Sequence, residues 1–385
     1  MEKQSRRLNQ VIAPTIAIVF VVIFSTFAVA QRENAAAVFA SAPRVQTSVK
    51  GVTAFAAPSK GFNPLTATNV QLLTYGLPQR PDKATNPKAY EHWERAMLAL
   101  KIHPNDVKAM PYSSHTMVPA GQPSAAPIDN TLAVGSYNWS GIANTNKLKT
   151  WNNSTSFNEV DSVFNVPVAK PPFGSVPCSD GPWLESSWNG IGGYTEGSLV
   201  QGGSALYWDG AGCKGKIIYN GWVEWYPSYP ELEIDCGKTA CVVSPGDDFY
   251  VISYGVAGTA EQFVFVEDLT QNWGGTFGMT WVSGPGLIGT SAEYIVERPC
   301  CTGSGKFYPL TNYIYDFFDY SYALDGKGTA FFAGSTAATT AVFTMYADDG
   351  STAISYPTAG TAGYQGRYSI WFVDENCAYS GGCTP

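Results

Sequence analysis

Short runs of aromatic and β-branched residues recur along the chain beyond residue 132, and Gly, Pro, Asn and Asp separate them. Such runs are typical of strands bounded by turns. They cover residues 216–226, 249–254, 262–269, 293–296, 329–332 and 368–372. Since no helical stripe separates them, the pattern predicts an all-β domain built as an antiparallel sandwich or jelly roll.

One stretch before this domain has a helical pattern. Asn86 and Pro87 supply the N-cap and the first position of a helix predicted near residues 87–101, whose apolar residues recur at helical spacing. The surrounding residues 31–130 are rich in Ala, Pro, Ser and Thr. We predict a partly helical pro-segment or linker there, followed by the β-sandwich domain at residues 131–385. The helix either packs on its own domain or covers an acidic cleft.

Residues 1–30 have the pattern of a targeting segment. Three basic residues lie among the first seven, and an uncharged, largely apolar run follows at residues 11–30. Ala28 and Ala30 are small residues that suit cleavage by signal peptidase. We predict a signal peptide and secretion. The alternative is an uncleaved anchor at residues 11–30, because about 20 apolar residues can span a bilayer. Both interpretations place the remainder outside the cytoplasm.

Charge divides the chain sharply. Residues 1–110 carry a net charge of +7, whereas residues 111–385 carry a net charge of −15. Nucleic acid is not an expected partner of so acidic a domain, since phosphate binding needs a basic face. The opposite signs favour attraction between the first part and the domain, so we expect the pro-segment to act as an inhibitor near neutral pH.

All eight cysteines lie beyond residue 170, and an even number in an exported domain indicates disulfides. Their short spacings predict local loops closed by Cys236 with Cys241 and by Cys377 with Cys383. No histidine accompanies these cysteines, which disfavours a zinc site. Neither a metal nor a cofactor is expected.

Histidine usage limits the chemistry of the β domain. The chain has three histidines, and none follows His115. A Ser-His-Asp or Cys-His mechanism within the domain is therefore excluded, as is a His-ligated metal site. No Gly-rich phosphate-binding loop of the form G-x-x-x-x-G-K-[ST] occurs. If the domain is catalytic, carboxyl groups must carry the reaction.

Two predicted strands place carboxyl groups and aromatic rings on one face. Alternate residues of a strand share a face, so the side chains of two sets project together. These sets are Trp222, Glu224 and Tyr226, and Glu293, Ile295 and Glu297. Burying such faces would cost several kcal/mol for each unpaired charge. A concave, partly solvated face lined by aromatic residues avoids this cost and suits a peptide groove.

The ordered set of motifs resembles the glutamic peptidases, also called eqolisins. The matching segments are Ser136-Tyr137-Asn138-Trp139-Ser140-Gly141, Phe164-Asn165-Val166-Pro167, Trp188 to Gly193, Gln201, Trp222-Val223-Glu224-Trp225-Tyr226-Pro227, Glu267-Asp268-Leu269-Thr270 and Ala292-Glu293-Tyr294-Ile295-Val296-Glu297. They cover roughly residues 133–320 in order and in approximate spacing.

The resemblance implies a two-sheet antiparallel sandwich of the concanavalin-like jelly-roll type and a monomer that cleaves polypeptides in acid after synthesis as a precursor. Gln201 and Glu297 match the family's catalytic pair. Active-site support positions match four further residues, which are Trp188, Trp222, Glu224 and Tyr226. In this mechanism Glu297 takes a proton from water and returns it to the leaving amine, while Gln201 holds the water and donates to the oxyanion.

Two positions depart from the family's pattern. Gly192 and Ala205 stand where the family usually has acidic residues that help to position the catalytic pair. Glu196 and Asp209 are the candidates to rebuild this support. Reduced activity, or a degenerate member without activity, is the other consequence that the resemblance allows.

Two other classes of function stay open. Residues 231–235, Glu-Leu-Glu-Ile-Asp, alternate three carboxyl groups along one strand, as a jelly-roll glycosidase would require. A non-catalytic, carbohydrate-binding sandwich would instead use exposed Trp and Tyr rings to stack on sugars. Replacing Glu297 by Gln would leave the function of such a binding module unchanged.

Overall fold

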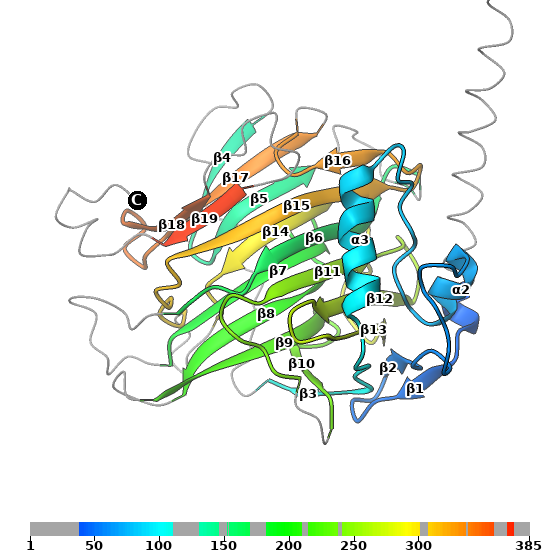
Figure 1. The fold of residues 1–385 in the computed structure, drawn as a ribbon. Coiled ribbons are helices and arrows are strands. Elements are labelled where there is room, and N and C mark those ends of the chain that lie inside the picture. Colours follow the sequence, from blue (N-terminus) through cyan, green and yellow to red (C-terminus); the bar gives the residue numbers. More distant parts are fainter. Residues whose placement is uncertain are drawn as a thin grey trace, which may run out of the picture.

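A computed structural model of the chain describes residues 38–110, 131–145, 152, 154–169, 182–209, 215–237, 241–300, 307–335, 338–357 and 368–372. Strands make up about half of these residues, and the helices α2 (Asn69–Thr74) and α3 (Pro87–Ala99) accompany them (Figure 1). Residues 1–30 and the pair Cys377 and Cys383 lie outside this description. Among the described residues, no helix is both long enough and apolar enough to cross a membrane.

The first sheet, sheet A, contains the strands that carry the candidate residues. Its order from edge to edge is β3 (Asp106–Ala109), β10 (Leu232–Asp235), β9 (Lys216–Tyr226), β8 (Leu199–Asp209), β7 (Leu184–Gly192), β14 (Ser291–Glu297), β5 (Trp139–Thr145), β17 (Thr339–Tyr346) and β4 (Thr131–Ser136). All neighbours are antiparallel except β17 and β4, which are parallel.

The second sheet, sheet B, packs against the first. Its order is β1 (Arg44–Gln46), β2 (Val52–Phe55), β13 (Trp273–Thr280), β12 (Glu261–Asp268), β11 (Asp248–Tyr254), β6 (Phe157–Asn165) and β15 (Tyr315–Asp325), which also pairs with β16 (Ala330–Phe332) and β19 (Tyr368–Phe372). The strand β18 (Ala353–Pro357) pairs with both β17 and β19, so hydrogen bonds connect the two layers at one side. The predicted antiparallel two-sheet sandwich is confirmed.

Strand alternation explains which side chains fill the space between the sheets. Trp225 and Tyr294 project inward from sheet A, and Phe249 and Val264 from sheet B, all buried in one cluster. Asn189 also points inward, and its Nδ2 donates to Val251 O on β11 at 2.8 Å. This inner face leaves the opposite face of sheet A for the alternate residues, which include the candidate site.

The predicted helix forms where its capping residues place it. The helix α3 spans Pro87–Ala99, and Asn86 Oδ1 accepts a hydrogen bond from Ala89 N at 3.3 Å. A shorter helix, α2, spans Asn69–Thr74 and begins with a capping box formed by Thr68 and Gln71. The capping satisfies backbone N–H groups that the first turn of a helix leaves without partners.

The apolar side of α3 packs on the outer face of sheet B. Trp93 and Met97 lie in one buried cluster with Ile252 and Phe265, and Figure 1 shows α3 lying across β15, β6, β11 and β12. The candidate residues lie on the outer face of the other sheet. The interpretation in which this helix covers the candidate cleft therefore does not hold for α3, and the helix packs on its own domain.

Among the described residues, three ion pairs of Lys or Arg join the basic N-terminal segment to the acidic domain. They are Arg44–Glu261, Arg95–Asp248 and Lys108–Glu233, the last at 3.3 Å. All are partly exposed, and such pairs contribute about 0–1 kcal/mol each. Burial of a large apolar side chain contributes about 1.5–3 kcal/mol. Apolar contacts such as those of Trp93 therefore contribute more than charge to the attachment of this segment.

The predicted local disulfide between Cys236 and Cys241 is confirmed, with their Cα atoms 5.3 Å apart. It closes a loop directly after β10. Cys300 is also disulfide-bonded.

Candidate active site

The candidate residues share the outer face of sheet A, and the strand register places them in three rows. One row runs Glu293, Gly190, Gln201 and Glu224 across β14, β7, β8 and β9. The next row runs Ile295, Trp188, Gly203 and Trp222, and the third runs Glu297, Ser186, Ala205 and Asn220. The prediction that the members of each set share a face of their strand agrees with this arrangement, and the register places both sets on the same face of sheet A.

The carboxyl group of Glu297 is held by two side-chain donors. Trp188 Nε1 donates to Glu297 Oε2 at 2.9 Å, and Asn138 Nδ2 donates to Glu297 Oε1 at 3.2 Å. Glu297 is 3% exposed. Hydrogen bonds of this kind fix the orientation of a carboxyl group.

Asn138 is itself positioned by a tight local turn between β4 and β5. Ser136 Oγ accepts hydrogen bonds from the backbone N–H groups of Asn138 and Trp139, at 3.2 and 3.0 Å, and donates to Asn138 Oδ1 at 3.1 Å. These residues belong to a motif that resembles the family, but the motif predicted no role for Asn138. Its place directly before a strand of the candidate face is the signal that could have identified it.

The side chain of Gln201 is oriented by Glu224 on the neighbouring strand. Gln201 Nε2 donates to Glu224 Oε2 in a short hydrogen bond, and the two residues are direct partners in the β8–β9 ladder. Gln201 Oε1 has no hydrogen-bond partner among the described residues. The amide oxygen of Gln201 therefore retains its full capacity to accept a hydrogen bond.

Gln201 and Glu297 lie two strands apart and four residues apart along the strand direction. Trp188 and Gly203 lie between their rows. A Cβ atom at Gly203 would lie 2.8 Å from Trp188 Cβ, so glycine allows the Trp188 side chain to pack there.

The aromatic residues at the matched support positions lie on the same sheet face as Gln201 and Glu297. Trp188 and Trp222 are fully buried on this face, and Tyr226 packs against the same cluster. Met110, at the end of the described N-terminal segment, belongs to this cluster as well. We expected a partly solvated face, whereas Gln201, Glu224 and Glu297 are all at most 3% exposed. Aromatic rings and Met110 cover the face more fully than strand alternation indicated.

Glu293 is a second carboxyl group on the face, in the same row as Gln201. Its Oε1 accepts a hydrogen bond from Tyr194 N at 3.3 Å. Burial raises the pKa of Glu293 well above its usual range. Glu293 is therefore a neutral carboxylic acid in acid solution, unlike a residue that must serve as a carboxylate base.

Glu196 fills the space beside Gly192, where the family's usual acidic residue is absent. Gly192 has a φ of +88°, and a Cβ atom there would lie 2.3 Å from Ser198 O and 2.8 Å from Glu196 Oε1. The Glu196 carboxyl group accepts hydrogen bonds from the backbone N–H groups of residues 288, 289 and 290, at 2.7, 2.7 and 3.0 Å. Glu196 thus anchors the β7–β8 turn to the chain entering β14.

Ala205 is the second position that departs from the family's pattern, and its neighbours explain why a small residue fits there. Ala205 pairs with Ser186 on one side and Asn220 on the other, so small or uncharged side chains occupy this row up to Glu297. The side chain of Asp209 lies outside the description, and its predicted supporting role stays untested.

The carboxyl groups of residues 231–235 lie near the edge of sheet A, where two of them form structural contacts. Glu233 forms the ion pair with Lys108 of β3, and Asp235 Oδ1 accepts from Gly237 N at 2.8 Å. Glu231 is buried and precedes the strand. This arrangement gives no support to the glycosidase alternative. Among the described residues, no group of three or more His, Cys, Asp or Glu side chains could hold a metal ion.

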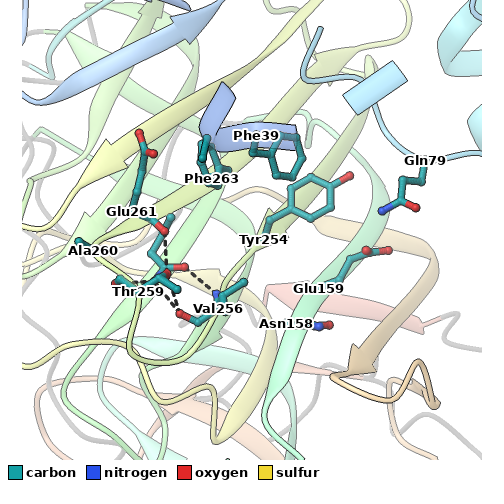
Figure 2. A pocket seen from close by; sticks show the side chains of 12 residues that line it. Phe39, Gln79, Asn158, Glu159, Tyr254, Val256, Thr259, Ala260, Glu261 and Phe263 are labelled. Atoms are coloured by element: carbon teal, nitrogen blue, oxygen red, sulfur yellow. Dashed lines mark hydrogen bonds between the residues drawn. The ribbon is translucent and has the colours of Figure 1, made fainter. Parts of the chain in front are cut away.

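One cavity lies away from this face, at the outer face of sheet B. It has a volume of about 260 Å³ and is lined by Phe39, Tyr254 and Phe263 together with polar groups that include Glu159 and Gln79. Figure 2 shows the three rings grouped at its apolar side. None of the candidate catalytic residues lines this cavity, and the chemistry of the face on sheet A is the better guide to function.

Comparison with known proteins gives a family and a set of similar folds. The model of the peptidase A4 family matches residues 137–359, which is more than half of the chain. No curated protein matches the chain.

Three solved structures illustrate the similarity. Scytalido-glutamic peptidase with a transition state analog inhibitor has a TM-score of 0.47 and 21% identity, covering 62% of this chain and 98% of that one. SCP-B, a member of the eqolisin family in complex with the tripeptide Ala-Ile-His, has a TM-score of 0.44 and 19% identity, covering 62% and 98%. Aspergilloglutamic peptidase from Aspergillus niger has a TM-score of 0.40 and 20% identity, covering 50% and 99%.

The family match over residues 137–359 agrees with the motifs quoted from the sequence, and we conclude that the chain belongs to the peptidase A4 family and is a glutamic-type peptidase.

Proposed function

We propose that the protein is an exported endopeptidase that cleaves polypeptides in acid, with Glu297 and Gln201 as its catalytic residues. One observation carries this proposal. Glu297 is a buried carboxyl group held by Trp188 and Asn138, on the same sheet face as a Gln201 amide held by Glu224. A carboxyl group and an amide group therefore lie on the same sheet face, each held in a fixed orientation by hydrogen bonds.

Glu297 acts first as a general base and then as a general acid. It removes a proton from the attacking water, and it returns this proton to the leaving amine when the tetrahedral intermediate collapses. The donors Trp188 and Asn138 hold the carboxylate in place without supplying a competing proton acceptor. A carboxyl group suits this double role in acid, because glutamate in model peptides titrates near about 4.3.

Gln201 supplies the polar contacts that a neutral amide can make. One N–H is engaged by Glu224, so its orientation is set before substrate binds. Its Oε1 accepts a hydrogen bond from the attacking water, and its second N–H donates to the oxyanion that develops from the peptide carbonyl. This division of roles needs no histidine and no metal.

We further propose that the described form of the chain is a precursor. The burial of Glu297 and Gln201 supports this view, since substrate must displace what covers them. Met110 is the described part of the N-terminal segment that packs on this face. We therefore expect the end of the segment at Met110 to inhibit the enzyme by covering this face. Cleavage of the chain between His115 and Gly135 is the expected activating step. A rise in activity at low pH with the precursor still intact would contradict this activation route.

Digestion of a denatured protein substrate between about pH 2 and pH 7, in the presence of pepstatin, tests the catalytic proposal. We expect cleavage confined to acid in the processed wild type and its loss in Glu297→Gln and Gln201→Ala. If processed, folded wild type cleaves nothing, the protein is a non-catalytic member of the family.

A further inference from the structure

We propose that residues 38–110 are a permanent structural part of the enzyme and stay bound to the β domain after the chain is cut between residues 111 and 130. In this view cleavage frees the end of the segment at Met110 to leave the candidate face, while the rest of the segment is not a removable cover. It becomes a second, non-covalently held chain of the mature protein. The inference concerns the architecture of the segment and does not depend on which residues catalyse the reaction.

Backbone pairing ties the segment to both sheets. On sheet B, β2 pairs with β13 through Ala54 opposite Phe277, and Gly274 N donates to Ile102 O at 3.0 Å. On sheet A, β3 pairs with β10 over four residues, from Leu232 opposite Ala109 onward. The segment thus occupies one edge of each sheet. Its loss would leave β13 and β10 as open edges, which folded proteins avoid.

Apolar packing ties the segment to the outer face of sheet B. Trp93, Leu72 and Leu73 are buried at 0 to 2% exposure, and they share a cluster with Tyr250 and Phe265 of the domain. These contacts join residues on both sides of the proposed cut. Removing the segment would expose a continuous apolar face of the sheet, which soluble proteins rarely present.

Polar contacts between the two parts add specificity to this packing. Tyr320 OH donates to Asn86 Oδ1, and Thr276 Oγ1 donates to Gly76 O, both as short hydrogen bonds. Arg95 pairs with Asp248 at the side of α3. A segment that served only as a cover for the catalytic face would not need contacts on the opposite layer, so the distribution of contacts points to a structural role.

The test is a controlled cut in the full chain. A recognition sequence for a site-specific protease is inserted between residues 111 and 130 of the Glu297→Gln variant, so that neither self-cleavage nor turnover enters the readout. The protein is cut and analysed by size-exclusion chromatography and native mass spectrometry at pH 4 and pH 7. We expect the two pieces to migrate together as a 1:1 complex at both pH values. Separation of the pieces, with the β domain still folded and monodisperse, would overturn the proposal.

A pair of variants on α3 provides a matched comparison. Trp93 is fully buried, whereas Leu98 on the same helix is 63% exposed. We expect Trp93→Ala to accelerate release of the cut segment at least 10-fold and Leu98→Ala to leave its release rate unchanged. Equal release rates in both variants would count against the apolar interface as the means of retention.

A measurement without substitutions covers the case in which Trp93→Ala does not fold. Hydrogen exchange of the cut protein reports the backbone amides of β13 and β10 directly. We expect these amides to stay as protected as in the uncut chain. Exchange of both edges at the rate of open strands would show that the segment had left.

Discussion

Trp188 Nε1 donates a hydrogen bond of 2.9 Å to Glu297 Oε2, and the two residues come from neighbouring strands, β7 and β14. They are not direct partners in the ladder, since Trp188 faces Ile295 there. The indole therefore reaches diagonally along the face, and Gly203 leaves the room for its Cβ atom. This contact links an aromatic residue at one of the matched support positions to the proposed catalytic carboxyl group.

Replacing Trp188 by Phe should retain most of the ring and remove the donor. A hydrogen bond to a charged group contributes about 1.5–3 kcal/mol, so we expect kcat to fall by roughly 10- to 100-fold. KM should change much less if the indole positions Glu297 and does not bind substrate. Steady-state kinetics on a peptide substrate at the pH of maximum activity provide the measurement, and an unchanged kcat would remove Trp188 from the catalytic arrangement.

Glu297→Gln and Glu293→Gln form a decisive pair of variants. General acid–base catalysis contributes typically about 10²- to 10⁴-fold, and Gln at position 297 can neither accept nor return the proton. Burial raises the pKa of Glu293, so this residue is a neutral acid under working conditions and Gln mimics it closely. We expect loss of cleavage in the first variant and activity within a few fold of wild type in the second. The reverse result would move the base to Glu293, which shares the row of Gln201.

Glu224→Ala should affect catalysis through Gln201. Without its acceptor, the Gln201 amide loses the orientation that the β8–β9 pairing provides. We expect kcat to fall by about 10- to 100-fold. Glu224→Gln, which keeps an oxygen acceptor for the Gln201 N–H, should recover part of the loss. Equal activity in both variants would indicate that Gln201 is held by other contacts.

A buried acid pair between the sheets should make the protein less stable at neutral pH. Burial raises the pKa of Asp316 to about 7, and burial together with the neighbouring Asp316 raises the pKa of Glu185 well above its usual range. Both groups titrate near about 4 when unfolded. For Asp316 the stabilising effect is therefore complete below about pH 4 and is lost as pH rises through about 7, and the effect of Glu185 has the same sign. For Asp316 alone the loss is on the order of 4 kcal/mol.

Asp316→Asn should consequently raise Tm at pH 8 and change it little at pH 4. Asp349→Asn should change Tm at pH 8 in the opposite direction and serves as a comparison. Hydrogen bonds from Thr352 and Ser351 lower the pKa of Asp349 to about 2, so its ionised form is the favourable one and the substitution should lower Tm at pH 8. Thermal unfolding at the two pH values tests both expectations.

Gly192→Asp should not restore the family's usual support. The new side chain would adopt an unfavourable φ of +88° and collide with Ser198 O and Glu196. Backbone strain of this kind costs about 1–3 kcal/mol. We expect a lower Tm and no gain in activity. A more active Gly192→Asp protein would show that Glu196 can move and that the missing acid limits the wild type.

More could be predicted from the sequence about the residues on the candidate face than about the residues that surround them. Glu224 and Tyr226 could be placed on one face of their strand, and Ile295 and Glu297 on one face of theirs, because strand alternation depends only on positions within a strand. Asn138 was quoted in a motif but received no role, since its contact with Glu297 joins residues 159 positions apart. The position of Glu196 beside Gly192 depends likewise on how a turn folds back.

Sequence alone determined the all-β class, the paired candidate residues Gln201 and Glu297, and the helix that begins at Pro87, because each of these follows from local spacing or from ordered motifs. Tertiary structure alone decided that α3 covers sheet B, that β2 and β3 complete both sheets, and that Glu185 and Asp316 are buried together. These outcomes depend on edges and faces that exist only once distant strands have paired, and no local pattern carries that information.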